Sequence, residues 1–340
     1  MSVLAPTLSS LWKQVEDCGL DPEPLFSKHG VNAAKLADAN ARISYLKTDR
    51  IMADAAQLSG DLFFGLNEAK YLLPSQMGPL GFAWLASTSL RSAIQRLQRY
   101  INVLHERMQL TVTDNMDSVQ VFIHTDVPSA NAYQRDVGYL AALNKMCRFV
   151  RGNDWNPALV SVAHPAPADT SRFYEMFRCP VEFNAGQNSL NIDKQQADER
   201  LIGANKQLAQ LNDHIVVRYL ASQSRDDIVN RVKSAILERL GQGSVTETAI
   251  AESLHMSTRK LHRKLDSKNT NFKKLLLEIR SELANQYIND ITLTLTEISF
   301  MLGFSEISSF SRAYKRWTGM SPSEARKSQN AAYQSSNHNK

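Results

Sequence analysis

The sequence predicts an α+β N-terminal domain followed by an all-α domain in which a long helix joins two helix-turn-helix units. Three observations favour this fold class. A chain of 340 residues is long enough for two domains of about 100 to 200 residues each. Apolar residues recur at helical spacing over about the first 110 positions and then alternate in short runs, as they do in strands. The last third shows one pattern twice, two short helices separated by a turn.

The N-terminal domain is expected to span residues 1–193 and to begin with helices. Leu90, Ile94 and Leu97 start an apolar stripe that continues through Ile101 and Leu104, with arginines between its members. This spacing places the apolar side chains on one face of a helix. The same region is divided by Pro and Gly clusters into several shorter helices.

The second half of this domain is expected to supply a β-sheet. Residues 110–113 and 118–123 flank a polar turn, which predicts a β-hairpin. The elements predicted after it are a helix at 132–150, a strand at 158–164 and a second hairpin formed by 181–183 and 189–192.

Residues 194–226 are predicted to form one long helix, from about 195 to 222, and a linker at 222–226. Leu201, Leu208 and Ile215 recur every seven residues, with Ala204 and Leu211 between them. This repeat suits a two-helix seam between two copies of the chain, and it equally suits a stripe packed on its own domain. The polar tail at 328–340 is expected to be disordered.

Composition excludes several classes of protein. Hydrophobic residues make up 43% of the chain and charged residues 21%, which argues against wholesale disorder. We expect no transmembrane helix, no signal peptide and no membrane partner, because apolar runs of sufficient length are missing. The 3 scattered cysteines fit reduced thiols in a cytoplasmic protein.

The net charge of +5 is concentrated in the last third of the chain. Residues 226–340 hold 17 Lys and Arg against 12 Asp and Glu, whereas residues 1–225 hold 22 of each. A neutral domain joined to a basic one indicates that the second domain meets a polyanion.

The first helix-turn-helix unit is predicted between residues 245 and 265. Thr246 is the expected N-cap of a short helix, and Ser257 is the expected N-cap of the next. Leu261 and Leu265 face the core, which leaves Arg259, His262 and Arg263 on the opposite face. Arginines placed three to four residues apart on a helix suit insertion into the DNA major groove.

The second unit is predicted between residues 294 and 317, with Gly303 in its turn. Phe310, Ala313, Tyr314 and Trp317 form the apolar stripe of its second helix, and the other face is available to DNA. Asn271 to Asn289 is expected to join the units as one helix of about 28 Å, so that both could enter successive major grooves. The domain is therefore expected to span residues 227–327.

These residues resemble a known family. The segments IAESLHMSTRKLHRKL and EISFMLGFSEISSFSRAYKRWTGMSPSEAR are similar to the DNA-binding domain of the AraC/XylS family of bacterial transcription regulators. The chain departs from the family at Asn269, where Gly is frequent, and Asn tolerates the left-handed conformation. The matching signature positions are Ile298, Gly303-Phe304, Ser309-Phe310, Arg312, Tyr314-Lys315, Gly319 and Ser321-Pro322.

The N-terminal domain resembles the arabinose-binding-type domain of the subgroup that includes regulators of ornithine and arginine metabolism. Both resemblances together imply a regulator, more often an activator, that binds double-stranded promoter DNA, works with RNA polymerase and responds to a small-molecule effector that the sequence does not identify. A homodimer is possible. The segments that carry this resemblance are Gly19-Leu20-Asp21, Phe64-Gly65-Leu66, Gly78-Pro79-Leu80-Gly81 and Cys179-Pro180-Val181-Glu182-Phe183.

The expected site is a DNA-contacting surface, without catalytic residues, metal ligands or cofactor. Patterns for nucleotide binding, metalloprotease chemistry and zinc binding are missing from the sequence. The alternative to a sensor is a constitutive DNA-binding regulator whose N-terminal domain only dimerises or docks a protein; a closed cavity would favour sensing. The candidate DNA contacts are Ser257, Arg259, Lys260, His262 and Arg263 in the first unit and Ile307, Ser308, Ser311, Arg312 and Lys315 in the second.

Overall fold

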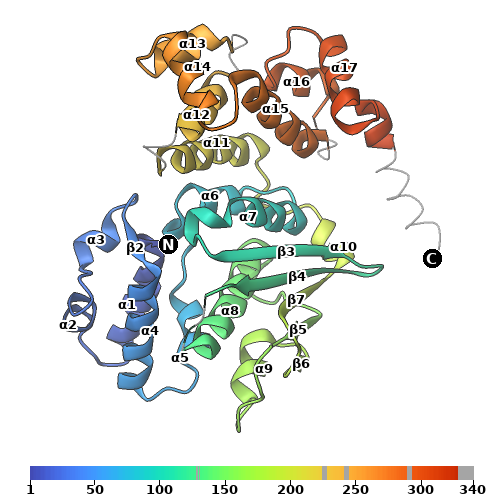
Figure 1. Ribbon diagram of the computed structural model, residues 1–340. Helices are drawn as coiled ribbons and strands as arrows, with labels where there is room; N and C mark the ends of the chain where they lie inside the picture. The colour runs from blue at the N-terminus through green and yellow to red at the C-terminus, as the bar shows by residue number, and fades with distance from the viewer. Residues whose placement is uncertain (128, 130, 224–227, 241–244, 289–292, 328–340) are drawn as a thin grey trace. The chain divides into compact units, whose positions relative to one another are not determined.

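A computed structural model describes the chain except residues 128, 130, 224–227, 241–244, 289–292 and 328–340. The chain forms two compact units, which we call the first compact unit (Met1–Val216) and the second compact unit (Val217–Lys340) (Figure 1). The predicted tail at 328–340 and most of the predicted linker lie outside the described residues. Among the described helices, none has the length and apolar character needed to cross a membrane.

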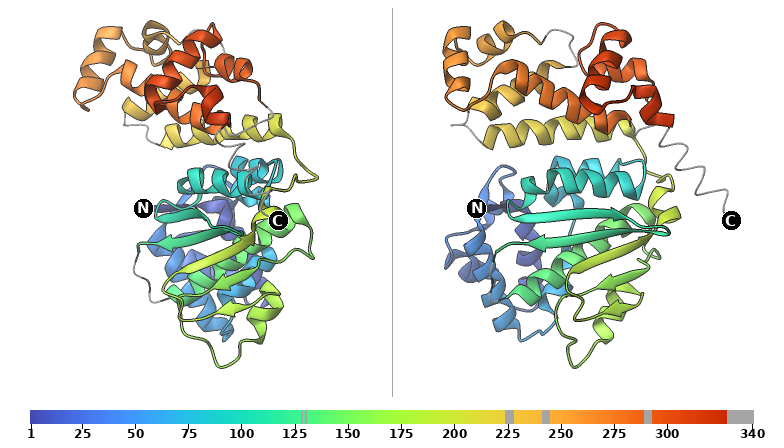
Figure 2. Two further views of the ribbon diagram at one scale, coloured as in Figure 1. Left: turned by 90° about the vertical axis from the view of Figure 1, so that its right-hand side faces the viewer. Right: turned by 45° about the vertical axis from the view of Figure 1, so that its right-hand side comes forward.

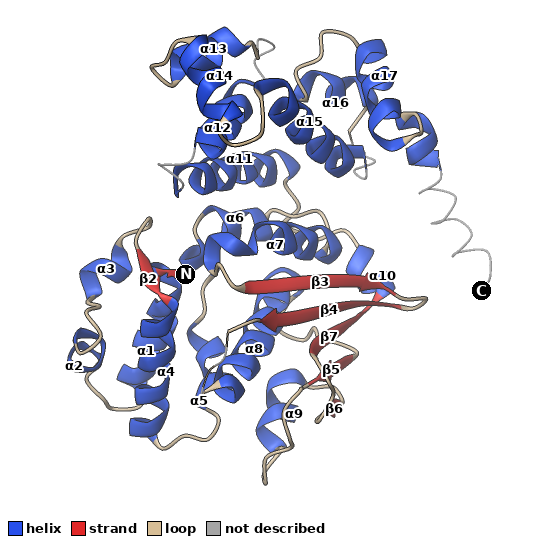
Figure 3. Ribbon diagram, viewed as in Figure 1, coloured by secondary structure: helices blue, strands red, loops and turns tan. Residues whose placement is uncertain are grey.

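The first unit contains the predicted sheet (Figure 3). The first predicted hairpin is confirmed: β3 (Met108–Asp114) pairs antiparallel with β4 (Ser118–Thr125), with Val112 opposite Val121. Buried apolar residues alternate with more exposed ones along these strands, so one face of the hairpin is buried. The full strand order is β3-β4-β7-β5-β6.

The second predicted hairpin is wrong. β6 (Val181–Glu182) and β7 (Asn188–Asp193) are not neighbours, because β5 (Leu159–Ser161) lies between them. β5 pairs parallel with β6 and antiparallel with β7. Val160 of β5 is fully buried, so this strand gains more from a central position than from an edge.

Helices supply the remainder of the first unit, as expected. The predicted apolar stripe forms α7 (Leu90–Leu104), which lies beside the edge strand β3 in Figures 1 and 2. The predicted helix at 132–150 is α8 (Ala132–Arg151), which packs against β4 and β7. The others are α1 (Ser9–Asp17), α2 (Pro22–Ser27), α3 (Ala33–Ala37), α4 (Tyr45–Ser59), α5 (Phe64–Glu68), α6 (Pro79–Leu85) and α9 (Ser171–Phe177), with a small β1 (Ser2–Leu4) and β2 (Arg42–Ser44) ladder.

The single long helix predicted at about 195–222 is instead two helices, α10 (Lys194–Asp198) and α11 (Lys206–Gln223). The backbone between them is satisfied by the loop before α7: the amide of Leu201 donates to the Thr88 carbonyl and that of Asn205 to the Ala86 carbonyl, each at 2.9 Å. Since these bonds replace helical ones, the helix ends and restarts, with the Asn205 side chain accepting a bond from the amide of Leu208.

The buried face of α11 differs from the predicted seam. Ala209, Asn212 and Val216 are buried, whereas Leu208 and Leu211 are 45% and 54% exposed. Leu208 and Leu211 therefore lie largely outside the packed face of α11, whereas Leu201, another predicted seam position, is buried before that helix begins.

The second unit is all-α, and the two helix-turn-helix units share one apolar core. Its helices are α12 (Ile228–Leu240), α13 (Glu247–Ser253), α14 (Thr258–Asp266), α15 (Phe272–Ile288), α16 (Leu295–Met301) and α17 (Ile307–Thr318). α15 is the predicted joining helix; its 17 residues span about 25 Å. Ile250 and Leu261 of the first helix-turn-helix unit belong to the same buried cluster as Ile298 and Phe310 of the second helix-turn-helix unit.

Candidate DNA-binding interface and an N-terminal cavity

The first helix-turn-helix unit has the predicted local structure. The Thr246 hydroxyl accepts a bond from the amide of Ala249 at 3.2 Å, and the Ser257 hydroxyl accepts one from the amide of Lys260 at 3.3 Å. These caps start α13 and α14. The turn between them passes through His255, whose φ of 55° lies in the left-handed region.

The second helix-turn-helix unit begins with a capping box and has a glycine in its turn and another at its end. A capping box starts α16: the amide of Thr294 donates to the Glu297 carboxylate at 2.7 Å, and the amide of Glu297 donates to the Thr294 hydroxyl at 3.1 Å. Gly303 in the turn has φ of +70°, and a Cβ there would lie 2.7 Å from the Leu240 carbonyl oxygen. Gly319 ends α17 at φ of +84° with open space around it.

The predicted contact residues lie on the exposed faces of α14 and α17. Leu261, Leu265, Phe310, Ala313 and Tyr314 are buried, as the apolar stripes required. Ile307 is 42% exposed, which places this apolar side chain in solvent at the start of α17. The exposed residues are Ser257, Arg259, Lys260, His262, Arg263, Ile307, Ser308, Arg312 and Lys315, and Ser311 is half-buried.

His262, one of the predicted contact residues, has a partner on another helix. The His262 imidazole of α14 contacts the Glu247 carboxylate in the first turn of α13. This pair links α13 and α14, the two helices of the first helix-turn-helix unit. The adjacent guanidinium of Arg263 stays exposed.

Sequence reasoning missed Arg280, whose side chain hydrogen-bonds the turn between α16 and α17 in the second helix-turn-helix unit. From α15, its Nε donates to the Leu302 carbonyl and its Nη2 to the Gly303 carbonyl, both at 2.9 Å. The guanidinium also lies 4.4 Å from the centre of the Phe304 ring. Burial lowers the pKa of Arg280 from its ordinary value. A lone arginine in a helix carries no sequence signal for this role.

The first compact unit contains a partly open cavity of about 210 Å³ that sequence reasoning did not locate. Helices α1, α4, α7 and α8 and the hairpin β3–β4 all contribute to its wall. From α7, the wall takes Leu97, Ile101 and Leu104. No sequence pattern marks a space that side chains leave empty, so only the folded structure shows it.

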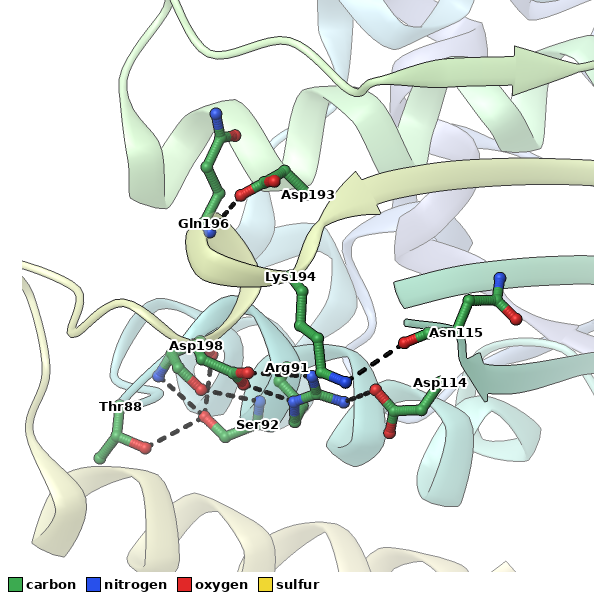
Figure 4. A network of polar contacts seen from close by, with 10 residues as sticks. Thr88, Arg91, Ser92, Asp114, Asn115, Asp193, Lys194, Gln196 and Asp198 are labelled. Carbon is green, nitrogen blue, oxygen red and sulfur yellow. Dashed lines mark hydrogen bonds and ion pairs between the residues drawn. The ribbon is translucent and has the colours of Figure 1, made fainter. Parts of the chain in front are cut away.

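The opposite side of α7 is held to α10 and α11 by ion pairs. Arg91 lies between Asp198 of α10, which its Nη2 contacts at 3.0 Å, and Asp114 of β3, as Figure 4 shows. Arg96 donates from Nε to Asp213 of α11 at 2.6 Å. One helix therefore contacts both the cavity and the start of the segment that leads to the second unit.

Two helix-turn-helix units on one core, following in sequence an α+β domain with a cavity, define a DNA-binding transcriptional regulator. Family models agree. One described as an arabinose-binding domain of AraC transcription regulator, N-terminal, matches residues 19–201, and one described as a helix-turn-helix domain matches residues 250–328. The chain belongs to the AraC family of transcription regulators, whose role is not enzymatic.

Curated relatives match over almost the whole chain. The ornithine utilization regulator of Pseudomonas aeruginosa is 30% identical over 92% of this chain and 92% of its own length, which confirms the subgroup resemblance. The HTH-type transcriptional regulator VirS of Mycobacterium tuberculosis is 25% identical over 94% of this chain and 95% of its own. The crystal structure of transcriptional regulator CdpR from Pseudomonas aeruginosa is 19% identical, covers 94% of this chain and 98% of its own, and has a TM-score of 0.47.

Proposed function

We propose that this AraC-type regulator is a cytoplasmic activator controlled by a small molecule bound in the cavity of its first unit. The cavity is the observation that carries the proposal, because a domain that only dimerises or docks a protein needs no apolar cavity of about 210 Å³. The family resemblance supports activation through RNA polymerase and a homodimeric state.

The proposed route of control runs through α7. A ligand against Leu97 and Ile101 would shift α7, and the pair of Arg96 with Asp213 would pass that shift to α11. Arg96→Met should therefore leave DNA binding intact and abolish the response of the regulated promoter to its inducing condition. Arg99→Met is the matched control, since Arg99 lies on the same helix and stacks on Tyr100 at 5.5 Å. Equal promoter responses in the two variants would contradict the route.

Ala142→Phe separates the sensor from the constitutive alternative without knowledge of the effector. Ala142 lines the cavity, so a phenyl group there fills space that a ligand needs. Promoters bound by the protein are first mapped across the genome, and a reporter from one of them is compared between the parent and Ala142→Phe. A changed response with unchanged promoter occupancy supports sensing. An unchanged response supports a docking or dimerisation domain.

In the second compact unit, we assign DNA contact to the ten candidate residues on α14 and α17. Arg263 and Arg312 are the sharpest test, because each guanidinium is exposed and can pair with guanine for about 1–3 kcal/mol of base discrimination. A base-by-base specificity profile of Arg263→Ala and Arg312→Ala should relax at one cluster each, about 10 base pairs apart. A uniform loss of affinity would mean that the arginine contacts phosphate.

Residues 227–327 are proposed to bind DNA as an autonomous domain. The continuous core between α12 and α17 supports this boundary. The fragment expressed alone should retain specific promoter binding that weakens steeply with salt, through counterion release. A folded fragment without specific binding would contradict the assignment.

A further inference from the structure

The wall of the cavity is mainly apolar. Leucine, isoleucine, valine and methionine side chains dominate it, and four flexible thioethers, those of Met52, Met77, Met108 and Met146, reach it from different elements. A sugar or an amino acid would leave hydroxyl or charged groups against this wall without hydrogen-bond partners, at a cost of several kcal/mol. The methionines can adapt to the outline of an apolar molecule.

The size of the space limits the ligand. An apolar cavity of about 150 Å³ is known to hold benzene. In proportion to the six carbon atoms of benzene, a cavity of about 210 Å³ accepts a molecule of about eight or nine non-hydrogen atoms.

One buried hydrogen-bond donor in this wall lacks a partner. His105 is 4% exposed, and its Nδ1 accepts a bond from the amide of Arg107 at 3.2 Å, so Nε2 carries the ring proton. Among the described residues, Nε2 has no hydrogen-bond partner. The ring lies edge-on to Tyr45 and Tyr139, at 5.2 and 6.0 Å, and both tyrosines also line the cavity. Because burial lowers the pKa of His105 to about 4, the imidazole stays neutral and offers one N–H.

The charged groups of the wall are occupied by protein partners. Arg135 donates to Asp136, to the Tyr45 hydroxyl and to the Val127 carbonyl, each at 2.9 Å. An anionic ligand would thus find no free positive charge on Arg135, and it would be repelled by the Asp49 carboxylate of the same wall.

Asp49 and Glu68 complete the set of charged groups in the wall. The Asp49 carboxylate accepts bonds from Ser129 at 2.5 Å and from Tyr45 at 3.5 Å. The Glu68 carboxyl accepts one from Ser10 at 2.8 Å, and burial raises its pKa to about 7. An ammonium ligand could approach these carboxyl groups, but it cannot accept the proton of His105 Nε2.

We propose that the effector is a small neutral molecule with an apolar body and a single hydrogen-bond-accepting oxygen, such as a ketone, whose oxygen accepts the proton of His105 Nε2. The inference rests on the proposed sensing function and specifies the chemistry of its ligand. The hydrogen bond satisfies a buried donor that lacks a partner among the described residues, and the apolar body contacts the methionine and leucine side chains. The name of the matching domain model refers to a sugar, and that chemistry does not fit this cavity.

The test measures binding of three sets of probes to the full-length protein by titration calorimetry and by thermal shift. Acetophenone and 2-octanone are the neutral probes; benzoate and octanoate are the anions; 1-phenylethylamine and octylamine are the cations. Arabinose and ornithine are measured alongside. We expect the ketones to bind and to stabilise the protein, and the charged molecules of similar shape to bind at least tenfold more weakly.

Two variants tie binding to the cavity. His105→Phe keeps an aromatic ring and removes the donor, so ketone affinity should fall by about two- to tenfold, the value of one hydrogen bond. His124→Phe, at an exposed histidine of β4, is the matched control and should leave affinity unchanged. Ala142→Phe should abolish binding; it adds a side chain and removes no polar contact, so it remains informative where His105→Phe fails to fold.

Several results would overturn the proposal. These are tighter binding of an anion or a cation than of the ketones, binding of arabinose or ornithine that Ala142→Phe removes, and no binding of either ketone. Failure of the sensing function would give a different set of results. The ketones would bind, and His105→Phe and Ala142→Phe would lower their affinity, but promoter activity would be the same with and without a bound ketone. That last result leaves the ligand chemistry intact.

Discussion

Gly303 and Gly319 allow the cost of a close backbone approach to be separated from the cost of a left-handed conformation. Both residues have positive φ, +70° and +84°. Alanine in that region costs about 1–2 kcal/mol at either position. At Gly303 the added Cβ would also lie 2.7 Å from the Leu240 carbonyl oxygen, whereas nothing lies within 4 Å at Gly319. Overpacking of this kind costs a further amount of about 1–3 kcal/mol.

We therefore expect Gly303→Ala to destabilise the second compact unit by about 1–3 kcal/mol more than Gly319→Ala does. The measurement is native-state hydrogen exchange of the full-length variants, followed in peptides from α15, α16 and α17. Exchange through global opening of the unit should be about five- to 150-fold faster in Gly303→Ala than in Gly319→Ala. Equal exchange rates would refute the role assigned to the approach of Leu240, and faster exchange in Gly319→Ala would reverse it.

Three further predictions address other parts of the chain. Arg280→Met should destabilise α16 and α17 by about 2–3 kcal/mol, because two charge-assisted bonds to the turn are lost; unchanged hydrogen exchange there would contradict this. Leu208→Glu, on the exposed side of α11, should shift a dimer toward monomer in sedimentation, and an unfolded first unit would instead show an intradomain role. Because burial raises the pKa of Glu68 from 4.5 to about 7, the first unit should lose stability as pH rises from about 4.5 to about 7, and Glu68→Gln should remove that part of the pH dependence of urea unfolding.

Local signals in the sequence predicted local structure well. Thr246, Ser257 and Gly303 each act within a few residues, so the caps of the first helix-turn-helix unit and the turn of the second could be located from their spacing. The exposed faces of α14 and α17 followed from the same periodicity. The positions that contact DNA remain predictions, because exposure does not distinguish a base contact from solvated surface.

Features that depend on distant partners could not be predicted. The insertion of β5 between β6 and β7 depends on how strands pair in the sheet, and the alternation of each strand reads the same in either order. The break between α10 and α11 depends on carbonyls of Ala86 and Thr88, more than a hundred positions earlier in the chain by residue number. The role of Arg280 likewise appears only once α15 lies against the Gly303 turn.

The shared core of the second unit has a consequence for how its promoter preference can evolve. Ile250, Leu261, Ile298 and Phe310 are fully buried in one cluster, so substitutions there affect the fold of both recognition helices together. Arg263 and Arg312 are exposed and contribute little to that cluster. Mutations at the surface can therefore retarget one half-site at a time while folding stays intact, and divergence after gene duplication should accumulate on these two faces before it reaches the interior.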